Sequence, residues 1–301
     1  MAVFASLHSR ALSGPDKPYG QPIAPRVRNE RRSPLRPQFR EGWRKRICGF
    51  DPGGKSMPDV QAPSPIFVWI SRVDTLLAAE ANLNLLDKAD RAALQMLRCG
   101  PAKDSATAAR ILLRLSLSAM TSRRIAPQNW RFDRNSFGRP FVRDDSDGID
   151  FNVSHVDAVV MIAAGRGVKV GIDVETVDQN LEDKVIDHFC HASERQVLGA
   201  LPAVQRRRVF LELWTEKEAY TKMLGLGHSL EFHSLNVIRS QVAEADTPRV
   251  CTEEFYFSVD HSLYHAALVV DRSADHRPID IQLINVALTG KDTFPVSPVG
   301  F

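Results

Sequence analysis

Two acidic residues on one face of a predicted strand are the first candidates for chemistry. Residues 170–175 have the sequence Val-Gly-Ile-Asp-Val-Glu, which is typical of a strand. Asp173 and Glu175 then share one face, because successive side chains of a strand point to opposite sides. Unpaired carboxylates among apolar residues are unfavourable to bury unless a cation neutralises them. The alternative is that this face of the strand is solvated.

An acid and a base share one face of a predicted helix further along the chain. Residues 206–224 predict one long helix, and Gly225 ends it. Trp214, Glu218 and Lys222 are spaced by four and therefore lie on one face. Together with the strand acids, Glu218 and Lys222 could hold magnesium and an anionic ligand such as a pyrophosphate. The alternative is that Glu218 and Lys222 form an ion pair on an exposed helix.

Further polar residues could contact a phosphate or move a proton. Glu194, near a predicted helix start, could act as a general base or could simply favour the helix dipole. Ser154 and His155 end a predicted strand, and His155 could donate to a phosphate oxygen or make only a structural hydrogen bond. Arg110 and Arg139 could bind phosphate through their planar guanidinium groups. Arg110 could equally lie, with the arginine four residues later, on the solvated edge of an amphipathic helix.

The elements that position these residues occur twice in the same order. The sequence predicts strand, helix, strand, strand, and then this series again. We therefore expect an α+β fold of two similar α/β halves, residues 63–165 and residues 166–290, with the metal site in the second half and a tail at 291–301. A tight glycine turn further predicts a β-hairpin between residues 158–164 and 168–175.

Composition limits the classes of protein to consider. The chain has 301 residues with 44% hydrophobic and 25% charged residues, which is ordinary for a globular protein. The cysteines lack the paired spacing of a zinc site or disulfide framework, so we expect a reducing, cytoplasmic location. They are Cys48, Cys99, Cys190 and Cys251. No apolar run approaches the ~20 residues that span a bilayer, and no secretory signal is evident, so no membrane association is expected.

The first part of the chain differs in composition from the rest. Residues 1–62 are rich in Pro, Arg, Gly and Ser and lack periodicity, which predicts a disordered basic extension. It could be a solvated tail, a transit peptide, the product of an overlong gene start, or an arm that touches an acidic partner. The formal net charge of +3 does not indicate nucleic-acid binding. We expect no nucleic-acid partner, since the folded part shows no basic patch interleaved with aromatic residues.

Five motifs, taken together and in this order, resemble the 4′-phosphopantetheinyl transferase superfamily. The type most similar is the large single-chain type found with non-ribosomal peptide and polyketide synthetases. The resemblance covers about residues 66–270, so the N-terminal extension has no counterpart. The motifs are Ala-Arg-Ile-Leu-Leu-Arg at 109–114, Gly-Arg-Pro at 138–140, Phe-Asn-Val-Ser-His at 151–155, Gly-Ile-Asp-Val-Glu at 171–175, and Trp-Thr-Glu-Lys-Glu-Ala at 214–219 with Lys222, Gly225 and Gly227.

The resemblance implies a reaction and a metal. Such enzymes transfer the 4′-phosphopantetheine arm of coenzyme A to a serine of an apo acyl or peptidyl carrier protein and release 3′,5′-ADP. By this resemblance Asp173, Glu175 and Glu218 would bind Mg²⁺ against the pyrophosphate. Lys222 would contact a phosphate and stabilise charge in the transition state. Glu194 would be the base that activates the carrier serine.

The resemblance also implies the coenzyme A contacts and the fold. Arg110, Arg139, Ser154 and His155 would contact phosphates of coenzyme A, although Arg139 replaces the commoner lysine and Val156 replaces a commoner small polar residue. The family's fold has two similar α/β halves with the site at their interface, and a monomer is the simplest expectation. Two rival hypotheses are a non-catalytic module that binds coenzyme A or a carrier protein, and a nucleic-acid protein that uses the basic extension.

Overall fold

The structure is a computed structural model, and it describes most of the chain after residue 63. The predicted extension at residues 1–62 and most of the predicted tail at 291–301 lie outside the described residues. Within the described part, no helix combines the length and the apolar character that crossing a membrane requires. The described ranges are 64–156, 158–177, 183–227, 230–237, 250–271, 279–286 and 296–298.

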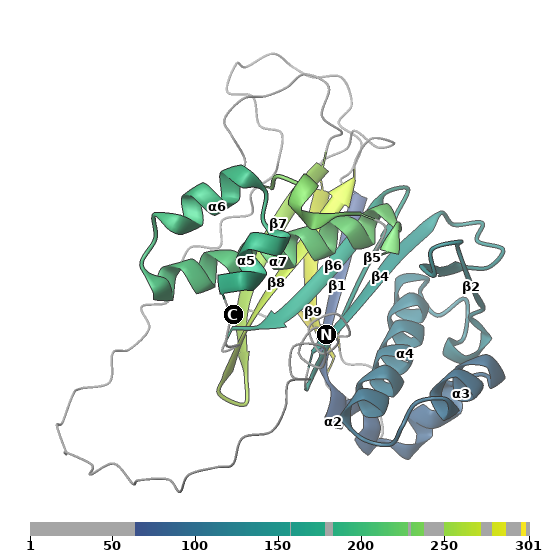
Figure 1. The fold of residues 1–301 in the computed structure, drawn as a ribbon. Helices are drawn as coiled ribbons and strands as arrows, with labels where there is room; N and C mark the ends of the chain where they lie inside the picture. The colour runs from purple at the N-terminus through teal and green to yellow at the C-terminus, as the bar shows by residue number, and fades with distance from the viewer. Residues whose placement is uncertain are drawn as a thin grey trace, which may run out of the picture. The chain divides into compact units, whose positions relative to one another are not determined.

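The first group of elements forms a sheet with a long helix against it. Strand β5 pairs antiparallel with both β1 and β4, and helix α4 packs against β5 and β4 (Figure 1). Their bounds are β1 Ser64–Arg72, α4 Pro101–Met120, β4 Ile149–Val156 and β5 Val159–Arg166. Shorter elements lie between them: α2 Val73–Ala78, η1 Glu80–Leu85, α3 Lys88–Gln95, η2 Pro127–Asn129, β2 Phe132–Arg134 and β3 Pro140–Val142.

The second group repeats this arrangement. Strand β8 pairs antiparallel with both β6 and β7, and helix α7 packs against β6 and β8 (Figure 1). In both groups a strand and a helix are followed by a hairpin, and the first strand lies beside the second strand of that hairpin. The bounds are β6 Lys169–Thr176, α5 Asp183–Phe189, α6 Ala192–Gly199, α7 Ala203–Leu224, η4 Phe232–Ser234, β7 Val250–Val259 and β8 Ser262–Asp271. The predicted α+β fold with two similar groups of elements is confirmed.

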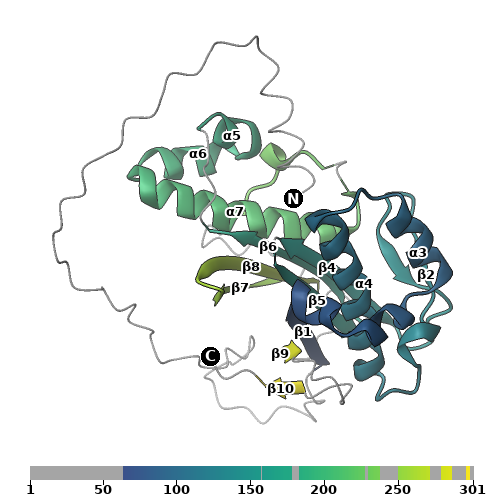
Figure 2. The same ribbon diagram turned by 90° about the horizontal axis from the view of Figure 1, so that it is seen from below.

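The last strands return to the first sheet. Strand β9, Ile279–Val286, pairs parallel with β1, and β10, Val296–Pro298, pairs antiparallel with β9. The first sheet therefore has the order β10-β9-β1-β5-β4, with β9 and β10 beyond β1 (Figure 2). Strand β9 lies within the residues expected for the second half, but it pairs with the first group of elements rather than the second. The boundaries proposed for the two halves stay a prediction.

The central strand β5 is apolar on both faces because each face meets a different part of the core. Val160 and Ile162 belong to the hydrophobic cluster beneath α4, which includes Trp69. Met161 and Ala163 belong to a second cluster that extends to β6 and β8. A strand covered on both sides loses the alternation of apolar and polar residues, which explains the unbroken apolar run in the sequence.

The predicted hairpin between residues 158–164 and 168–175 is wrong. Strand β5 pairs with β1 and β4, whereas β6 pairs with β8. Side chains of β4 reach the edge of β6 and accept hydrogen bonds from its backbone. Three alternate residues do so: Asp150 Oδ2 from Val170 N at 2.7 Å, Asn152 Oδ1 from Ile172 N at 2.9 Å and Ser154 Oγ from Val174 N at 3.3 Å. We call this set the β4–β6 ladder, and it holds the two sheets side by side.

Candidate active site

Three predicted site residues meet where β4, β6 and α7 come together. Asp173 on β6 is buried, with 4% of its surface exposed. Its Oδ1 atom lies 2.5 Å from Lys222 Nζ and accepts a hydrogen bond from Ser154 Oγ at 2.9 Å. Lys222 Nζ also donates to Ser154 Oγ at 3.1 Å. The structure therefore brings Ser154, Asp173 and Lys222 into one triangle, with one corner on each element.

The acidic side of this triangle carries more negative charge than Lys222 neutralises. Asp173 Oδ2 is buried and accepts no hydrogen bond from any residue that the structure describes. Glu175 is also buried and accepts a hydrogen bond from Trp214 Nε1 at 3.0 Å. Burial, and then the charge of Asp173, raise the pKa of Glu175 above its ordinary value. Two buried carboxyl groups, one with an oxygen that has no partner among the described residues, make this a site that attracts a cation.

Lys222 is held in its charged form. Burial opposes the ammonium, but the charge of Asp173, followed by that of Glu218, outweighs it and raises the pKa of Lys222. The side chain keeps 28% of its surface exposed, and it lines the smaller of two neighbouring cavities. An ammonium in this position can contact an anionic ligand as well as Asp173.

A glycine lets α7 approach β6 closely enough to form the triangle. A Cβ atom built on Gly171 would lie 2.0 Å from the carbonyl oxygen of Ala219 and 2.6 Å from the backbone nitrogen of Met223. Any side chain at this position would therefore push the helix off the strand. Gly171 thus sets the spacing between Asp173, two residues later on β6, and the last turns of α7.

Two cavities that share lining residues lie along β4, and the smaller one reaches the triangle at Lys222. The first, of about 250 Å³, is lined by Glu218 and Lys222 from α7 and by Asn152 from β4. The second, of about 350 Å³, is lined by His155 and Arg110. Pro140 and Val153 line both cavities. An extended ligand could therefore occupy both, with its middle beside Lys222.

The three predicted metal ligands are not gathered into one cluster. Among the residues described by the structure, no group of three or more His, Cys, Asp or Glu side chains is arranged to hold a metal ion. Asp173 and Glu175 lie on the same face of β6, whereas Glu218 lines the smaller cavity from α7. The chemistry of Asp173 and Glu175 still fits a cation, because one buried oxygen of Asp173 has no partner there.

His155 is neutral at physiological pH. Burial, and then the positive charge of Lys222, lower its pKa from 6.5 to about 4. A neutral imidazole has one N–H group to donate and one nitrogen that accepts. His155 can therefore give a phosphate a hydrogen bond rather than an ionic contact, from the wall of the larger cavity.

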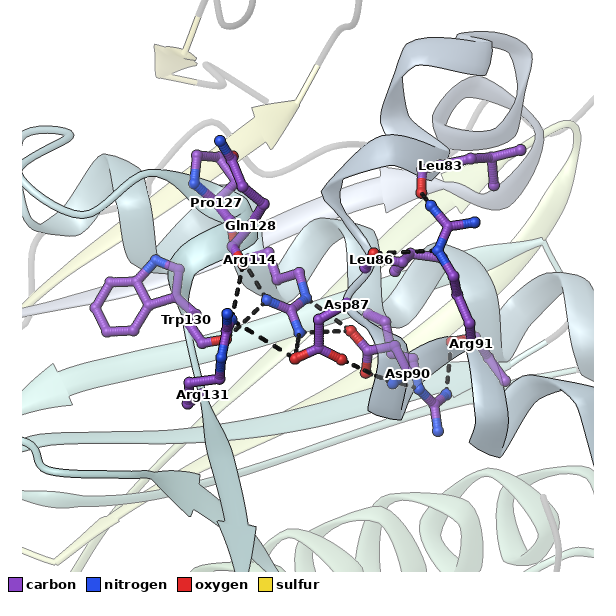
Figure 3. A network of polar contacts seen from close by, with 12 residues as sticks. Leu83, Leu86, Asp87, Asp90, Arg91, Arg114, Pro127, Gln128, Trp130 and Arg131 are labelled. Carbon is purple, nitrogen blue, oxygen red and sulfur yellow. Dashed lines mark hydrogen bonds and ion pairs between the residues drawn. The ribbon is translucent and has the colours of Figure 1, made fainter.

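Arg110 and Arg114 lie in an ionic network in the first group of elements. Arg114 is 1% exposed, and its Nη2 atom lies 2.9 Å from Asp87 Oδ2 and 2.6 Å from Asp90 Oδ2. It also donates to the carbonyl oxygen of Trp130 at 2.9 Å (Figure 3). The interpretation of a solvated helix edge is wrong for Arg114. Arg110 Nε lies 3.3 Å from Asp90 Oδ1 and lines the larger cavity, so a ligand there would share Arg110 with Asp90.

Glu194 is enclosed by protein groups. It is fully buried, its Oε2 atom lies 2.5 Å from Lys217 Nζ, and the same oxygen accepts from His191 N at 2.8 Å. Its Oε1 atom accepts from Val237 N at 3.0 Å. A carboxylate with both oxygens occupied and no exposure has no room for the hydroxyl of another protein. This placement argues against the predicted role of Glu194 as the base.

Arg139 is also occupied by the protein. Both of its terminal nitrogens donate to acceptors on α7, β4 and β6. A guanidinium group with its terminal N–H groups already bonded is poorly placed to bind a phosphate. This argues against the predicted contact between Arg139 and coenzyme A.

Sequence reasoning missed several residues that shape the site. Asp150 and Asn152 belong to the β4–β6 ladder, and their alternation with apolar residues in a strand is a signal that could have revealed them. Lys217 had no such signal, because its partner Glu194 lies 23 residues earlier in the chain. Asp87 and Asp90 lie on a different helix from the arginines they bind, and helical spacing shows only which residues share a face.

Comparisons with known proteins find a family match over the part of the chain that carries the site. Residues 169–273 match the family model described as the 4′-phosphopantetheinyl transferase superfamily. The 4′-phosphopantetheinyl transferase gsp of Aneurinibacillus migulanus is 34% identical over 117 residues, 39% of this chain and 47% of the relative. The 4′-phosphopantetheinyl transferase HetI of Nostoc is 32% identical over 124 residues, 40% of this chain and 52% of the relative. The chain spans about half the length of the curated relatives it matches.

The matched region and the observed site coincide. Residues 169–273 run from β6 through α7 to the end of β8 and include Asp173, Glu175, Glu218 and Lys222. The region that carries the carboxylates and the lysine thus matches the model of the family that the sequence motifs resemble.

Proposed function

We propose that this chain transfers the 4′-phosphopantetheine arm of coenzyme A to a serine of an apo acyl or peptidyl carrier protein and releases 3′,5′-ADP. The observation that carries the proposal is the triangle of Ser154, Asp173 and Lys222 beside two adjoining cavities. The family matches support the same reaction class. No base is assigned, because Glu194 is enclosed by Lys217 and backbone groups.

Coenzyme A is long enough to use both cavities. We place its adenosine end in the larger cavity, where Arg110 and the neutral His155 would contact phosphate oxygens. The pyrophosphate then lies near Pro140 and Val153, which both cavities share, and within reach of Ser154 and Lys222. The larger cavity, of about 350 Å³, lies in the size range typical of sites for small ligands.

A divalent cation would complete the acidic side of the site. Asp173, Glu175 and Glu218 would hold Mg²⁺, and the ion would supply positive charge to the pyrophosphate. The unpartnered oxygen of Asp173 and the raised pKa of Glu175 support this assignment. Glu218 would contribute from the wall of the smaller cavity.

Lys222 has the properties needed to stabilise the transfer. The carrier serine oxygen would attack the phosphorus next to the pantetheine arm, and the bond to the adenosine-side phosphate would break. Negative charge then grows on the departing phosphate oxygens. The ammonium of Lys222, kept charged by Asp173, can donate to these oxygens.

The direct test is transfer to a carrier protein. We expect an apo carrier incubated with the protein, coenzyme A and Mg²⁺ to gain the mass of one phosphopantetheine arm, and chelation of Mg²⁺ to prevent the gain. Calorimetric binding of coenzyme A with no mass gain across several carriers would instead support the rival hypothesis of a binding module. Persistence of transfer in chelator would remove the metal assignment.

A further inference from the structure

We infer that Arg139 is a positioning residue that fixes the place of Lys222 for the transfer reaction. This inference rests on the proposed function, and it gives Arg139 a structural connection to the reaction instead of a contact with coenzyme A.

The guanidinium of Arg139 joins the same three elements that carry the triangle. Its Nη1 atom donates to the carbonyl oxygens of Lys222 and Met223, the latter at 2.7 Å. Its Nη2 atom donates to Asp150 Oδ2 at 2.6 Å, to Phe151 O at 3.1 Å and to Val170 O at 3.0 Å. Helix α7 carries Lys222, β4 carries Ser154 and β6 carries Asp173. One side chain, 13% exposed, therefore ties the three corners of the triangle together.

The planar shape of arginine suits this task. The last carbonyl groups of a helix have no partner within the helix, and Arg139 bonds two of them at the end of α7. Its second terminal nitrogen points to the strands at the same time. A lysine is a point charge with three donors on a flexible stem, so in these surroundings it would leave some of the five acceptors of Arg139 without a bond.

The turn that carries Arg139 is docked on the helix end by a second residue. Asn135 Oδ1 accepts hydrogen bonds from Phe137 N at 3.0 Å and Arg139 N at 2.9 Å, and Asn135 Nδ2 donates to Gly225 O at 3.0 Å. Gly225 has a φ of 70°, and a Cβ there would lie 2.8 Å from Arg139 Cδ. The Gly-Arg-Pro turn and the glycine after α7 thus form one packed unit.

The hydrogen bonds that Arg139 makes to α7, β4 and β6, which we call the Arg139 clamp, also connect to the β4–β6 ladder. Asp150 Oδ2 accepts both from Arg139 and from Val170 N, which is the first rung of the ladder. Without Arg139, the last turn of α7 and the side chain of Asp150 would no longer be hydrogen-bonded to the same residue. The ammonium of Lys222 would then no longer be held at a fixed position against Asp173 and the pyrophosphate.

The test separates positioning from binding. In Arg139→Lys we expect kcat for transfer to fall by roughly 10-fold to 100-fold, because small misplacements of a catalytic group have effects of this size. The KM for coenzyme A should stay within about twofold, since no phosphate contact is removed. Arg143→Lys is the matched control, because Arg143 is half-exposed and pairs with Asp133 on the surface. A raised KM with unchanged kcat in Arg139→Lys would overturn the inference.

A second variant tests the inference if Arg139→Lys does not fold. A second measurement tests it if the proposed function is wrong. Asn135→Ala keeps the guanidinium of Arg139 but removes the hydrogen bonds of the Asn135 side chain to Gly225 O, Phe137 N and Arg139 N, and we expect a smaller fall in kcat. Amide hydrogen exchange needs no substrate, and residues 222–225 should exchange faster in Arg139→Lys than in the parent protein. If the parent protein transfers nothing, the proposed function is wrong. The rate of amide hydrogen exchange at residues 222–225 still tests the role of Arg139. Unchanged exchange there would overturn the clamp itself.

Discussion

Helix α7 carries two lysines, five residues apart, that each contact a buried carboxylate at 2.5 Å. Lys217 pairs with Glu194, and these side chains are 2% and 0% exposed. Lys222 pairs with Asp173, and these side chains are 28% and 5% exposed. The two pairs have similar chemistry and the same separation, and they differ in what else surrounds them.

The first pair is closed and the second is open. Lys217 Nζ donates to Glu194 and to the carbonyl oxygens of Phe189 and Phe232, so its three hydrogens are used. Asp173 keeps one oxygen without a partner in the described part of the chain. A pair whose hydrogen bonding is complete can only support the structure. A pair with a spare acceptor and a partly exposed lysine side chain that lines a cavity can also bind a ligand.

The largest expected effect is the loss of stability when Lys217 is removed from the closed pair. Lys217→Met leaves Glu194 buried without a counter-charge, and we expect the free energy of unfolding to fall by about 3–5 kcal/mol. Urea unfolding followed by circular dichroism measures this difference. Lys88→Met, at an exposed position on α3, is the control and should change little. A loss of less than about 1 kcal/mol for Lys217→Met would show that the two pairs do not differ as described.

Neutralising the open pair should affect activity rather than stability. Asp173→Asn keeps the shape of the side chain and relieves the repulsion with Glu175. We expect transfer to fall by about 100-fold or more, while the free energy of unfolding changes by less than about 1 kcal/mol. Steady-state kinetics and urea unfolding provide the two readouts. Asp104→Asn, exposed on α4, should alter neither, and full activity in Asp173→Asn would refute its role in the site.

The distance between α7 and β6 can be changed directly. Gly171→Ala places a methyl group against the backbone of α7, so the helix must shift, and overpacking of this kind is worth about 1–3 kcal/mol of stability. The shift should also lower transfer activity, because Asp173 and Lys222 lie on the two elements that separate. Thermal unfolding and transfer assays measure both effects. Gly199→Ala, with open space around its Cβ, should be close to neutral; equal effects would contradict this packing argument.

The smallest expected effect concerns how the free energy of unfolding depends on pH. It arises from His155, which lies near the open pair. The pKa of His155 is about 4 in the folded protein and 6.5 ordinarily, so the unfolded chain binds more protons between these values. His155 therefore adds stability above pH 6.5 that is lost as the pH falls toward 4. We expect His155→Gln to remove about 1 kcal/mol of the stability difference between pH 7 and pH 5. His233→Gln, largely exposed, should leave the slope unchanged, and an unchanged slope in His155→Gln would contradict the prediction.

Local patterns in the sequence predicted which residues lie near one another along an element. Alternation placed Asp173 and Glu175 on one face of β6, and the spacing of four placed Trp214 and Lys222 where they contact these two acids. The order of elements predicted the repeated arrangement, because similar patterns of strand and helix recur in both parts of the chain.

Partners that are distant in the sequence could not be predicted in this way. Nothing local to Arg114 shows that Asp87 and Asp90 surround it, and nothing local to Glu194 shows Lys217. The hairpin prediction failed for a related reason. A glycine turn between two apolar strands is compatible with pairing, but only the tertiary structure shows that β4 and β8 are the preferred neighbours of β5 and β6.

The β4–β6 ladder makes the junction between the sheets dependent on residue identity. A backbone-to-backbone junction would tolerate almost any side chain, whereas this one requires an acceptor at positions 150, 152 and 154. Each rung can therefore be weakened separately by a single substitution, without unravelling either sheet. Substitutions at one, two or all three of these positions would yield a series of proteins in which progressively fewer hydrogen bonds join the two sheets.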